Sequence, residues 1–85
     1  MPQGNRGWRS RVLSQLRGLH GLEGGVNIHY DYDHEVARIL RNGDHYKIRS
    51  YRGGYTTVES KVDVIRKLAL ILEPVDKRKL QIFYG

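Results

Sequence analysis

The segment KVDVIRKLALIL, residues 61–72, has the strongest periodic pattern in the chain and limits the folds open to it. Its apolar residues recur at helical spacing and fill about half of the helical circumference, with Leu70 placed among the polar residues. Those apolar residues are Val62, Val64, Ile65, Leu68, Ala69, Ile71 and Leu72. Ser60 is a suitable N-cap with Asp63 three residues later, and Pro74 ends the segment. We therefore predict an amphipathic helix that requires an apolar surface to cover.

Four other segments alternate between apolar and polar residues and are predicted to be strands. They are VNIHYDYD, HYKIRSY, YTTVES and KLQIFYG, and the sequence RGG forms a turn between the second and the third. The first strand places Val26, Ile28, Tyr30 and Tyr32 on one face and Asn27, His29, Asp31 and Asp33 on the other. We expect this strand to bury its two tyrosines and to expose His29 and its aspartates.

The segment HEVARILRNG, residues 34–43, fits two structures because Asn42-Gly43 suits both a hairpin turn and the end of a helix. Read as a strand, the segment mixes arginine with apolar residues on both faces. Read as a helix, it gathers its apolar residues on one side, namely Val36, Ala37, Ile39 and Leu40. We therefore predict a short helix over residues 33–42, with Asp33 as its N-cap.

The predicted order from residue 26 onward is strand, helix, strand, strand, helix, strand. Two right-handed crossovers around a hairpin give an α+β fold, the ferredoxin-like β-α-β-β-α-β sandwich, preceded by a basic N-terminal helix. If residues 35–41 form a strand instead, the order becomes α-β-β-β-α. That order resembles the topology of double-stranded-RNA-binding domains.

The N-terminal segment carries most of the excess positive charge. The 85-residue chain has a formal net charge of +6, and its first 22 residues contain four arginines and no acidic residue. The same segment stacks four apolar residues on one side of a helix, namely Trp8, Val12, Leu16 and Leu19. Gly24 and Gly25 form a hinge after it. We therefore divide the chain into a basic amphipathic arm, residues 1–24, and a compact α+β domain, residues 25–85.

The cluster HYDYDH, residues 29–34, is the best candidate for a metal or acid–base site. His29, Asp31 and Asp33 share one face of the predicted strand, but alternate residues of a strand lie about 6.5–7 Å apart. A shared ion therefore needs a ligand from another element, such as His45, and no feature of the sequence requires one. We interpret the cluster as a solvated strand face and predict neither a metal nor a cofactor.

The remaining motifs give no support to an enzyme. The chain has no cysteine, and it contains no nucleophile motif, Gly-rich phosphate loop or helical pair of histidines. We therefore expect a non-enzymatic protein.

Nucleic-acid binding, to DNA or RNA, is the leading functional hypothesis because arginine contacts phosphate through two hydrogen bonds and gains from counterion release. The expected contacts come from the arm and from a basic β-hairpin: Arg6, Arg9, Arg11, Arg17, Lys47, Arg49 and Arg52. The centre of the sheet is not expected to take part, because the first strand would point His29 and its aspartates outward and repel phosphate.

The alternative is a protein-interaction or assembly module that docks a partner, or a second copy of the chain, through the arm. Its predicted partner-binding residues are Trp8, Val12, Leu16, Leu19 and Leu70. No apolar run is long enough to span a membrane. The absence of cysteine favours the cell interior, so we expect an intracellular protein of the cytoplasm or of the nucleoid or nucleus. A further interpretation takes residues 1–22, with their arginines and lack of acids, as an organelle-targeting segment.

Overall fold

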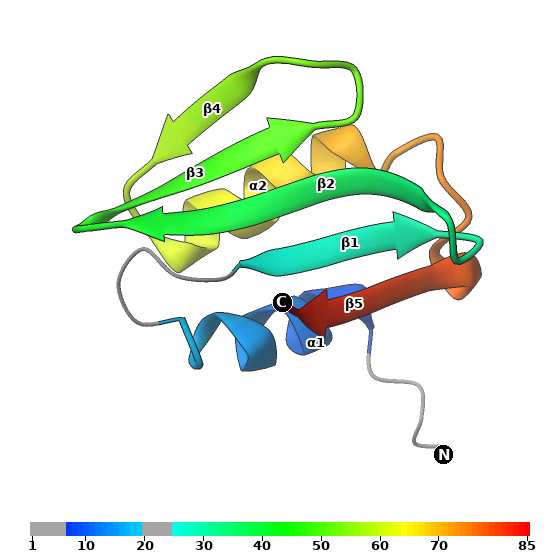
Figure 1. The fold of residues 1–85 in the computed structure, drawn as a ribbon, viewed down its shortest axis with the longest axis horizontal. Coiled ribbons are helices and arrows are strands. Elements are labelled where there is room, and N and C mark those ends of the chain that lie inside the picture. The colour runs from blue at the N-terminus through cyan, green and yellow to red at the C-terminus, as the bar shows by residue number, and fades with distance from the viewer. Residues whose placement is uncertain (1–6, 20–24) are drawn as a thin grey trace.

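The computed structural model describes residues 7–19 and 25–85, which form an α+β fold of two layers (Figure 1). In chain order the elements are α1 (Trp8–Leu16), β1 (Val26–Tyr30), β2 (His34–Asn42), β3 (His45–Ser50), β4 (Tyr55–Val58), α2 (Lys61–Ile71), a 3-10 turn (Lys77–Lys79) and β5 (Leu80–Tyr84). The α+β class predicted from the sequence is confirmed.

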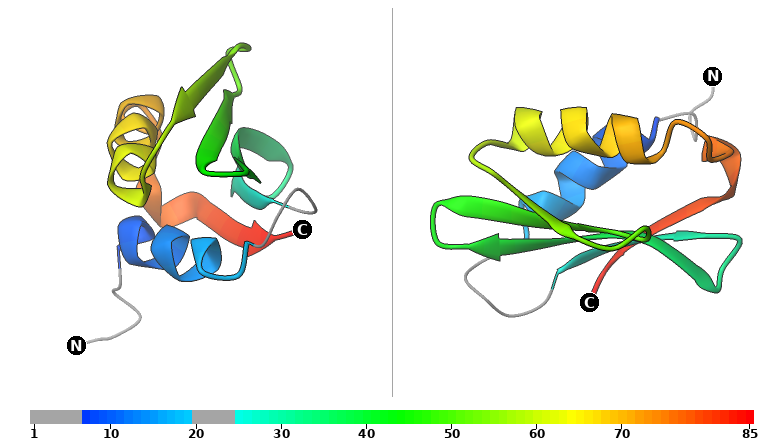
Figure 2. Two further views of the ribbon diagram at one scale, coloured as in Figure 1. Left: turned by 90° about the vertical axis from the view of Figure 1, so that its left-hand side faces the viewer. Right: turned by 90° about the horizontal axis from the view of Figure 1, so that it is seen from above.

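All five strands form one antiparallel sheet in the order β4-β3-β2-β1-β5. The first four strands follow one another as a meander. The chain then crosses through α2, and β5 returns beside β1. Both helices lie on the same face of the sheet, as the two views of Figure 2 show. Within residues 7–19 and 25–85, no helix covers the opposite face, which we call the outer face.

The segment from residue 34 to residue 42 is strand β2, so the predicted helix over residues 33–42 and the ferredoxin-like order are wrong. A β-bulge explains the misleading periodicity. Ile28 pairs with Ala37, but His29 pairs with Glu35, so Val36 is an extra residue on β2. Val36 and Ala37 are consecutive and both buried, which breaks the alternation expected of a strand. The α-β-β-β-α alternative correctly made this segment a strand, but it counted too few strands. The two that it leaves out, β4 and β5, lie in segments predicted as strands, YTTVES and KLQIFYG.

The end of β1 also differs from the prediction. The strand stops at Tyr30, and the next three residues form the turn into β2. Asp31 and Tyr32 have φ values of 53° and 70°, in the left-handed region that residues other than glycine seldom adopt. Tyr32 is 75% exposed, so its predicted burial is wrong, and Asp33 caps no helix. The chain reverses here because β2 pairs antiparallel with β1, which a continued strand would not allow.

The hydrophobic core lies between the inner face of the sheet and the two helices. The apolar stripe of the first helix is fully part of it, since Trp8, Val12, Leu16 and Leu19 are all buried. They join one continuous cluster with residues of every layer, including Ile28, Ile39, Ile48, Val64, Leu68 and Leu72. The division at residue 24 stays a prediction, but the core is shared across it.

The second helix begins as expected, because the Ser60 hydroxyl accepts a hydrogen bond from the Asp63 backbone N–H at 3.2 Å. Leu70 is 67% exposed, in agreement with its predicted position among polar residues. Val62 is 61% exposed, however, so its assignment to the apolar side is wrong. It lies in the first turn of α2, whose buried residues begin at Val64.

Candidate functional site

The outer face of the sheet carries a line of side chains in register across all five strands. Tyr55 of β4 pairs with Arg49 of β3, which pairs with Arg38 of β2. Arg38 in turn pairs with Asn27 of β1, and Asn27 with Phe83 of β5. We call these five residues the transverse row. Since neighbouring strands lie about 4.8 Å apart, the row is about 19 Å long, with an aromatic ring at each end and two arginines near its centre.

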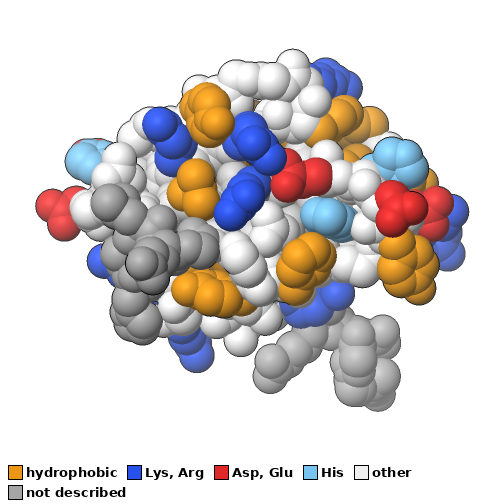
Figure 3. Space-filling model, in the orientation of Figure 1, with side chains coloured by type: hydrophobic (Ala, Val, Ile, Leu, Met, Phe, Trp, Pro, Cys, Tyr) orange, Lys and Arg blue, Asp and Glu red, His pale blue; other side chains and the backbone are white. Residues whose placement is uncertain are grey.

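Positive charge dominates the centre of this face. Lys47 lies on β3 two residues before Arg49 and pairs with Leu40 of β2, so a third cation adjoins the two arginines. Glu35 is the acidic group beside them, and its carboxylate binds the Arg49 guanidinium. Figure 3 shows basic and apolar side chains alternating over β2 and β3, with one acidic group next to them. The hydrogen bond and charge of Glu35 raise the pKa of Arg49 above its usual value.

The two arginines of the row are directly opposite each other on neighbouring strands, an arrangement that like charges disfavour. Glu35 compensates Arg49. Arg38 has only a long contact, 3.5 Å from Nη2 to the carbonyl oxygen of Gly85, and its buried Nε has no hydrogen-bond partner in the described part of the chain. The centre of the row is therefore a place where a bound anion would improve the electrostatics of the folded protein.

Aromatic rings end the row on both edge strands and remain accessible. Tyr55 is 58% exposed, and the Lys47 Nζ lies 4.9 Å from the centre of its ring. Phe83 is 42% exposed and meets the His29 ring edge-on, with 4.9 Å between ring centres. Both rings can offer an aromatic surface to a planar group, and each adjoins a nitrogen-bearing side chain, Lys47 or His29.

The predicted basic residues do not converge on one surface. Lys47 and Arg49 lie on the outer face, and Arg52 lies in the turn between β3 and β4. Arg9, Arg11 and Arg17 belong to α1 and its C-cap, on the opposite side of the sheet. Arg6 lies outside the described residues. The arm and the basic hairpin therefore form two separate positive surfaces.

The arginines of α1 are held in different ways. The Arg9 guanidinium stacks over the Trp8 ring, 4.7 Å from its centre. Arg11 is half-buried, and its Nε has no hydrogen-bond partner among the described residues. Arg17 is exposed at the end of the helix. These positions leave Arg9 and Arg17 accessible to solvent, but away from the transverse row.

The predicted partner-binding residues separate into two groups. Trp8, Val12 and Leu16 lie on α1, and Leu19 follows its C-cap. All four are enclosed in the core, so a partner would reach them only if this segment left the sheet. Leu70 is accessible and borders a pocket between α2 and the turn that follows β3. Partner binding and dimerisation stay predictions.

The HYDYDH cluster is organised by the turn between β1 and β2. The His29 Nδ1 lies 2.9 Å from the Tyr32 carbonyl oxygen, and the Tyr32 backbone N–H donates to the Gln81 side chain at 2.8 Å. Within residues 7–19 and 25–85, no three His, Asp or Glu side chains are grouped closely enough to hold a metal ion. No helix in the same ranges is long and apolar enough to cross a membrane.

Sequence reasoning missed four of the five residues of the row: Asn27, Arg38, Tyr55 and Phe83. Arg38 was assigned to a helix, which hid its place beside Arg49. The sequence pattern also placed Asp31 and Asp33 on the outer face of the first strand. Both lie in the turn after β1, so the reason for expecting that face to repel phosphate is wrong. The alternation of YTTV and LQIFY did contain a usable signal, because it puts Tyr55 and Phe83 on the polar side of their strands.

No protein-family model matches this chain, and neither does any curated protein or solved structure searched. We therefore infer function from the geometry of the outer face.

Proposed function

We propose that this protein binds single-stranded nucleic acid, without catalysing a reaction, through the outer face of its sheet. The observation that carries the proposal is the transverse row, in which two arginines lie between two exposed aromatic rings. Open sheet faces bind single strands by stacking bases on aromatic side chains while cations contact the phosphates. Tyr55 and Phe83 are suited to the first role, and Arg38, Arg49 and Lys47 to the second.

A single strand fits this face better than a duplex for a geometric reason. The cations and rings form a nearly linear row rather than a convex basic ridge. In the part of the chain that the structure describes, no helix or two-stranded ribbon projects from the face toward a groove. A strand lying along the row can expose its bases to the rings at either end. The contacts are to phosphates and ring faces, so we expect little sequence preference.

The test compares the outer face with the predicted arm, using variants of equal charge. Affinity for a fluorescent single-stranded oligonucleotide is measured at several salt concentrations. The sheet variant is Arg38→Gln with Lys47→Gln, and the matched control is Arg9→Gln with Arg17→Gln on α1. Losing two phosphate contacts should reduce the slope of log affinity against log salt by about 1.4. We expect this reduction in the sheet variant and a much smaller one in the control.

The aromatic ends provide an independent check. Tyr55→Ala and Phe83→Ala should each weaken binding by about 1–3 kcal/mol if bases stack on them, with little effect on the salt slope. Absence of binding by the wild-type protein at low salt contradicts the proposal. An α1 variant that loses as much affinity as the sheet variant assigns the binding to the arm instead.

A further inference from the structure

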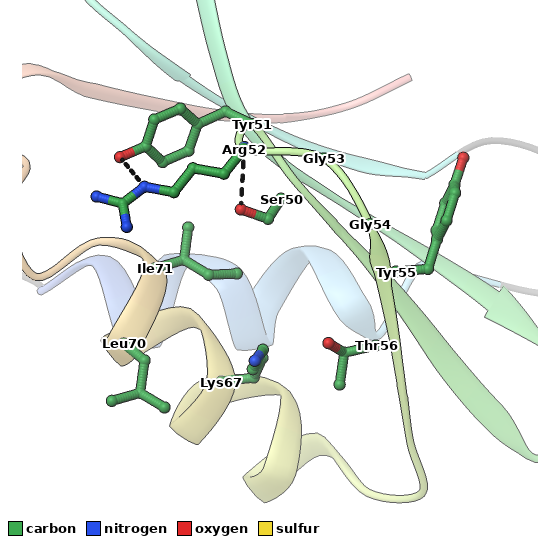
Figure 4. Close-up of a pocket in the computed structure, with 10 residues that line it drawn as sticks. All are labelled: Ser50, Tyr51, Arg52, Gly53, Gly54, Tyr55, Thr56, Lys67, Leu70 and Ile71. Carbon is green, nitrogen blue, oxygen red and sulfur yellow. Dashed lines mark hydrogen bonds between the residues drawn. The ribbon is translucent and has the colours of Figure 1, made fainter.

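A pocket of about 320 Å³ lies beyond the β4 edge of the sheet, between α2 and the turn that joins β3 to β4 (Figure 4). The turn contains Gly53 and Gly54 with φ values of 91° and 84°, which confirms that RGG is a turn and explains its glycines. In Figure 4 the side chains of Ser50, Thr56 and Lys67 border the space between the turn and the helix.

The polar lining of this pocket consists of groups that favour an anion. Arg52 and Lys67 supply positive charge, Ser50 and Thr56 supply hydroxyl groups, and no aspartate or glutamate among the described residues lines the cavity. The two glycines let a ligand approach the backbone without meeting a side chain. Cations, hydroxyls and an open glycine turn around a cavity of this size are typical of a phosphate site.

Arg52 and Lys67 both have hydrogen-bond donors that no described residue uses. The Arg52 Nε is held by the Tyr51 hydroxyl oxygen at 3.2 Å, and the Arg52 backbone N–H donates to the Ser50 Oγ at 3.3 Å. These bonds orient the arginine and leave its two terminal nitrogens without a partner in the described ranges. Lys67 is half-buried and forms no ion pair with any residue that the structure describes.

The pocket adjoins one end of the transverse row. Tyr55 contributes to its lining, while the ring of the same residue points away from the pocket and ends the row on the outer face. A strand lying along the row from Phe83 would therefore pass Tyr55 and reach the β4 edge. The cationic pocket lies next to Tyr55 at this edge, so the end of such a strand could enter it.

We infer that the pocket binds a phosphate monoester, and that its source is the terminal phosphate of a nucleic-acid strand held on the outer face. The assignment of the source rests on the proposed function, whereas the chemistry of the pocket does not. A terminal phosphate carries more negative charge than an internal one and exposes three oxygens, which suits two cations and two hydroxyls. The protein would thus prefer phosphorylated strand ends.

The experiment measures the affinity of the full chain for one oligonucleotide with a 5′-phosphate, with a 3′-phosphate and with neither. A mononucleotide and inorganic phosphate are the separate small probes. The variant is Lys67→Gln, and the matched control is Arg66→Gln, which removes the same charge from the neighbouring exposed position of α2 outside the pocket. Amide NMR shifts of Gly53 and Gly54 during the phosphate titration report on the pocket without any variant.

We expect one of the two terminal phosphates to raise wild-type affinity about tenfold, as for added hydrogen bonds between charged groups. The gain should disappear in Lys67→Gln and persist in Arg66→Gln. Equal affinity for all three oligonucleotides, or equal losses in both variants, would overturn the inference while leaving the proposed function intact. Binding of the mononucleotide that depends on Lys67, without binding of any oligonucleotide, would support the pocket's chemistry and overturn both its assigned source and the proposed function.

Discussion

The two faces of the sheet are built from alternate residues of the same five strands, yet they differ in almost every respect. The inner face is apolar and covered by two helices, and residues such as Ile28, Ile39 and Ile48 are buried there. The outer face carries Arg38 and Arg49 opposite each other. Burial of apolar area explains the inner face, whereas stability alone would disfavour the facing arginines. The contrast shows that the inner face maintains the fold, and it supports the proposal that the outer face binds a ligand.

The largest expected effect comes from removing the helix residue that closes the inner face. Trp8→Ala should destabilise the fold by about 3–5 kcal/mol, because a large buried ring leaves a cavity between α1 and the sheet. Urea unfolding followed by far-UV circular dichroism measures it, since the variant lacks the only tryptophan. The control, Ser14→Ala on the exposed side of α1, should stay within about 0.5 kcal/mol. A small effect of Trp8→Ala would mean that α1 is not part of the core in solution.

Substitutions at two adjacent residues of β2 allow the contributions of the two faces to stability to be compared directly. Ile39 is fully buried on the inner face, whereas Leu40 is half-buried on the outer face. Ile39→Ala should cost about 2–5 kcal/mol and Leu40→Ala less than about 1.5 kcal/mol, measured by urea unfolding. Equal losses would show that the outer face is covered in solution, for example by a second copy of the chain.

The turn between β1 and β2, which belongs to neither face of the sheet, contains backbone strain at Asp31 and Tyr32. Tyr32 has a positive φ and a largely exposed ring, so Tyr32→Gly relieves strain and should stabilise the protein by up to about 1 kcal/mol. The control is Thr57→Gly on β4, where glycine should destabilise by a similar amount. A loss of stability in Tyr32→Gly would indicate that its ring makes a stabilising contact.

Removing one arginine of the row should separate stability from binding. Arg38→Gln eliminates the facing like charges, so the free energy of unfolding should change by less than about 0.5 kcal/mol or increase slightly. Nucleic-acid affinity should fall in the same variant. Thermal unfolding at low and high salt measures the first effect. A loss well above 1 kcal/mol would mean that Arg38 is structural.

The smallest expected effect concerns the 3-10 turn before β5, which belongs to neither face. The Asp76 carboxylate accepts hydrogen bonds from the side chain and from the backbone N–H of Arg78. These bonds lower the pKa of Asp76, and the side-chain bond has the larger effect. A carboxyl whose pKa is lower in the folded state stabilises the fold above its unfolded pKa, about 4, and loses that contribution as pH falls. Asp76→Asn should therefore reduce stability slightly at pH 7 and less at pH 3. Arg78→Gln should show the same pH dependence, and a difference that grows in acid would contradict this account.

Local sequence patterns correctly predicted those elements whose regular spacing of apolar residues is not altered by pairing with other strands. The amphipathic segment around Leu68 became α2 with its Ser60 cap, and the stripe from Trp8 to Leu19 became a buried helix side. Residues 33–42 were mispredicted because the bulge at Val36 shifts the alternation by one residue and imitates a helical period. The error extended to the candidate site, since a residue assigned to a helix cannot be placed beside Arg49.

The candidate site was partly accessible from the sequence. Lys47 and Arg49 were expected to share a strand face, and they do. Their partners in the transverse row come from strands that are distant in the chain, and pairing across strands is a property of register rather than of local pattern. The predicted arm shows the same limit, because no pattern in residues 8–19 specifies on which side of the sheet its arginines lie.

The sequence by itself determined the α+β class, the concentration of arginine near the N-terminus and most of the residues that each helix buries, Val62 excepted, because helical and strand periodicities are local. Tertiary structure decided which strands are neighbours and therefore which side chains meet. Antiparallel pairing of β1 with both β2 and β5 moved Asp31 and Asp33 off the sheet into a turn and aligned Tyr55, Arg49, Arg38, Asn27 and Phe83. Strand residues up to 58 positions apart in the chain became neighbours through backbone hydrogen bonds, which local periodicity does not encode.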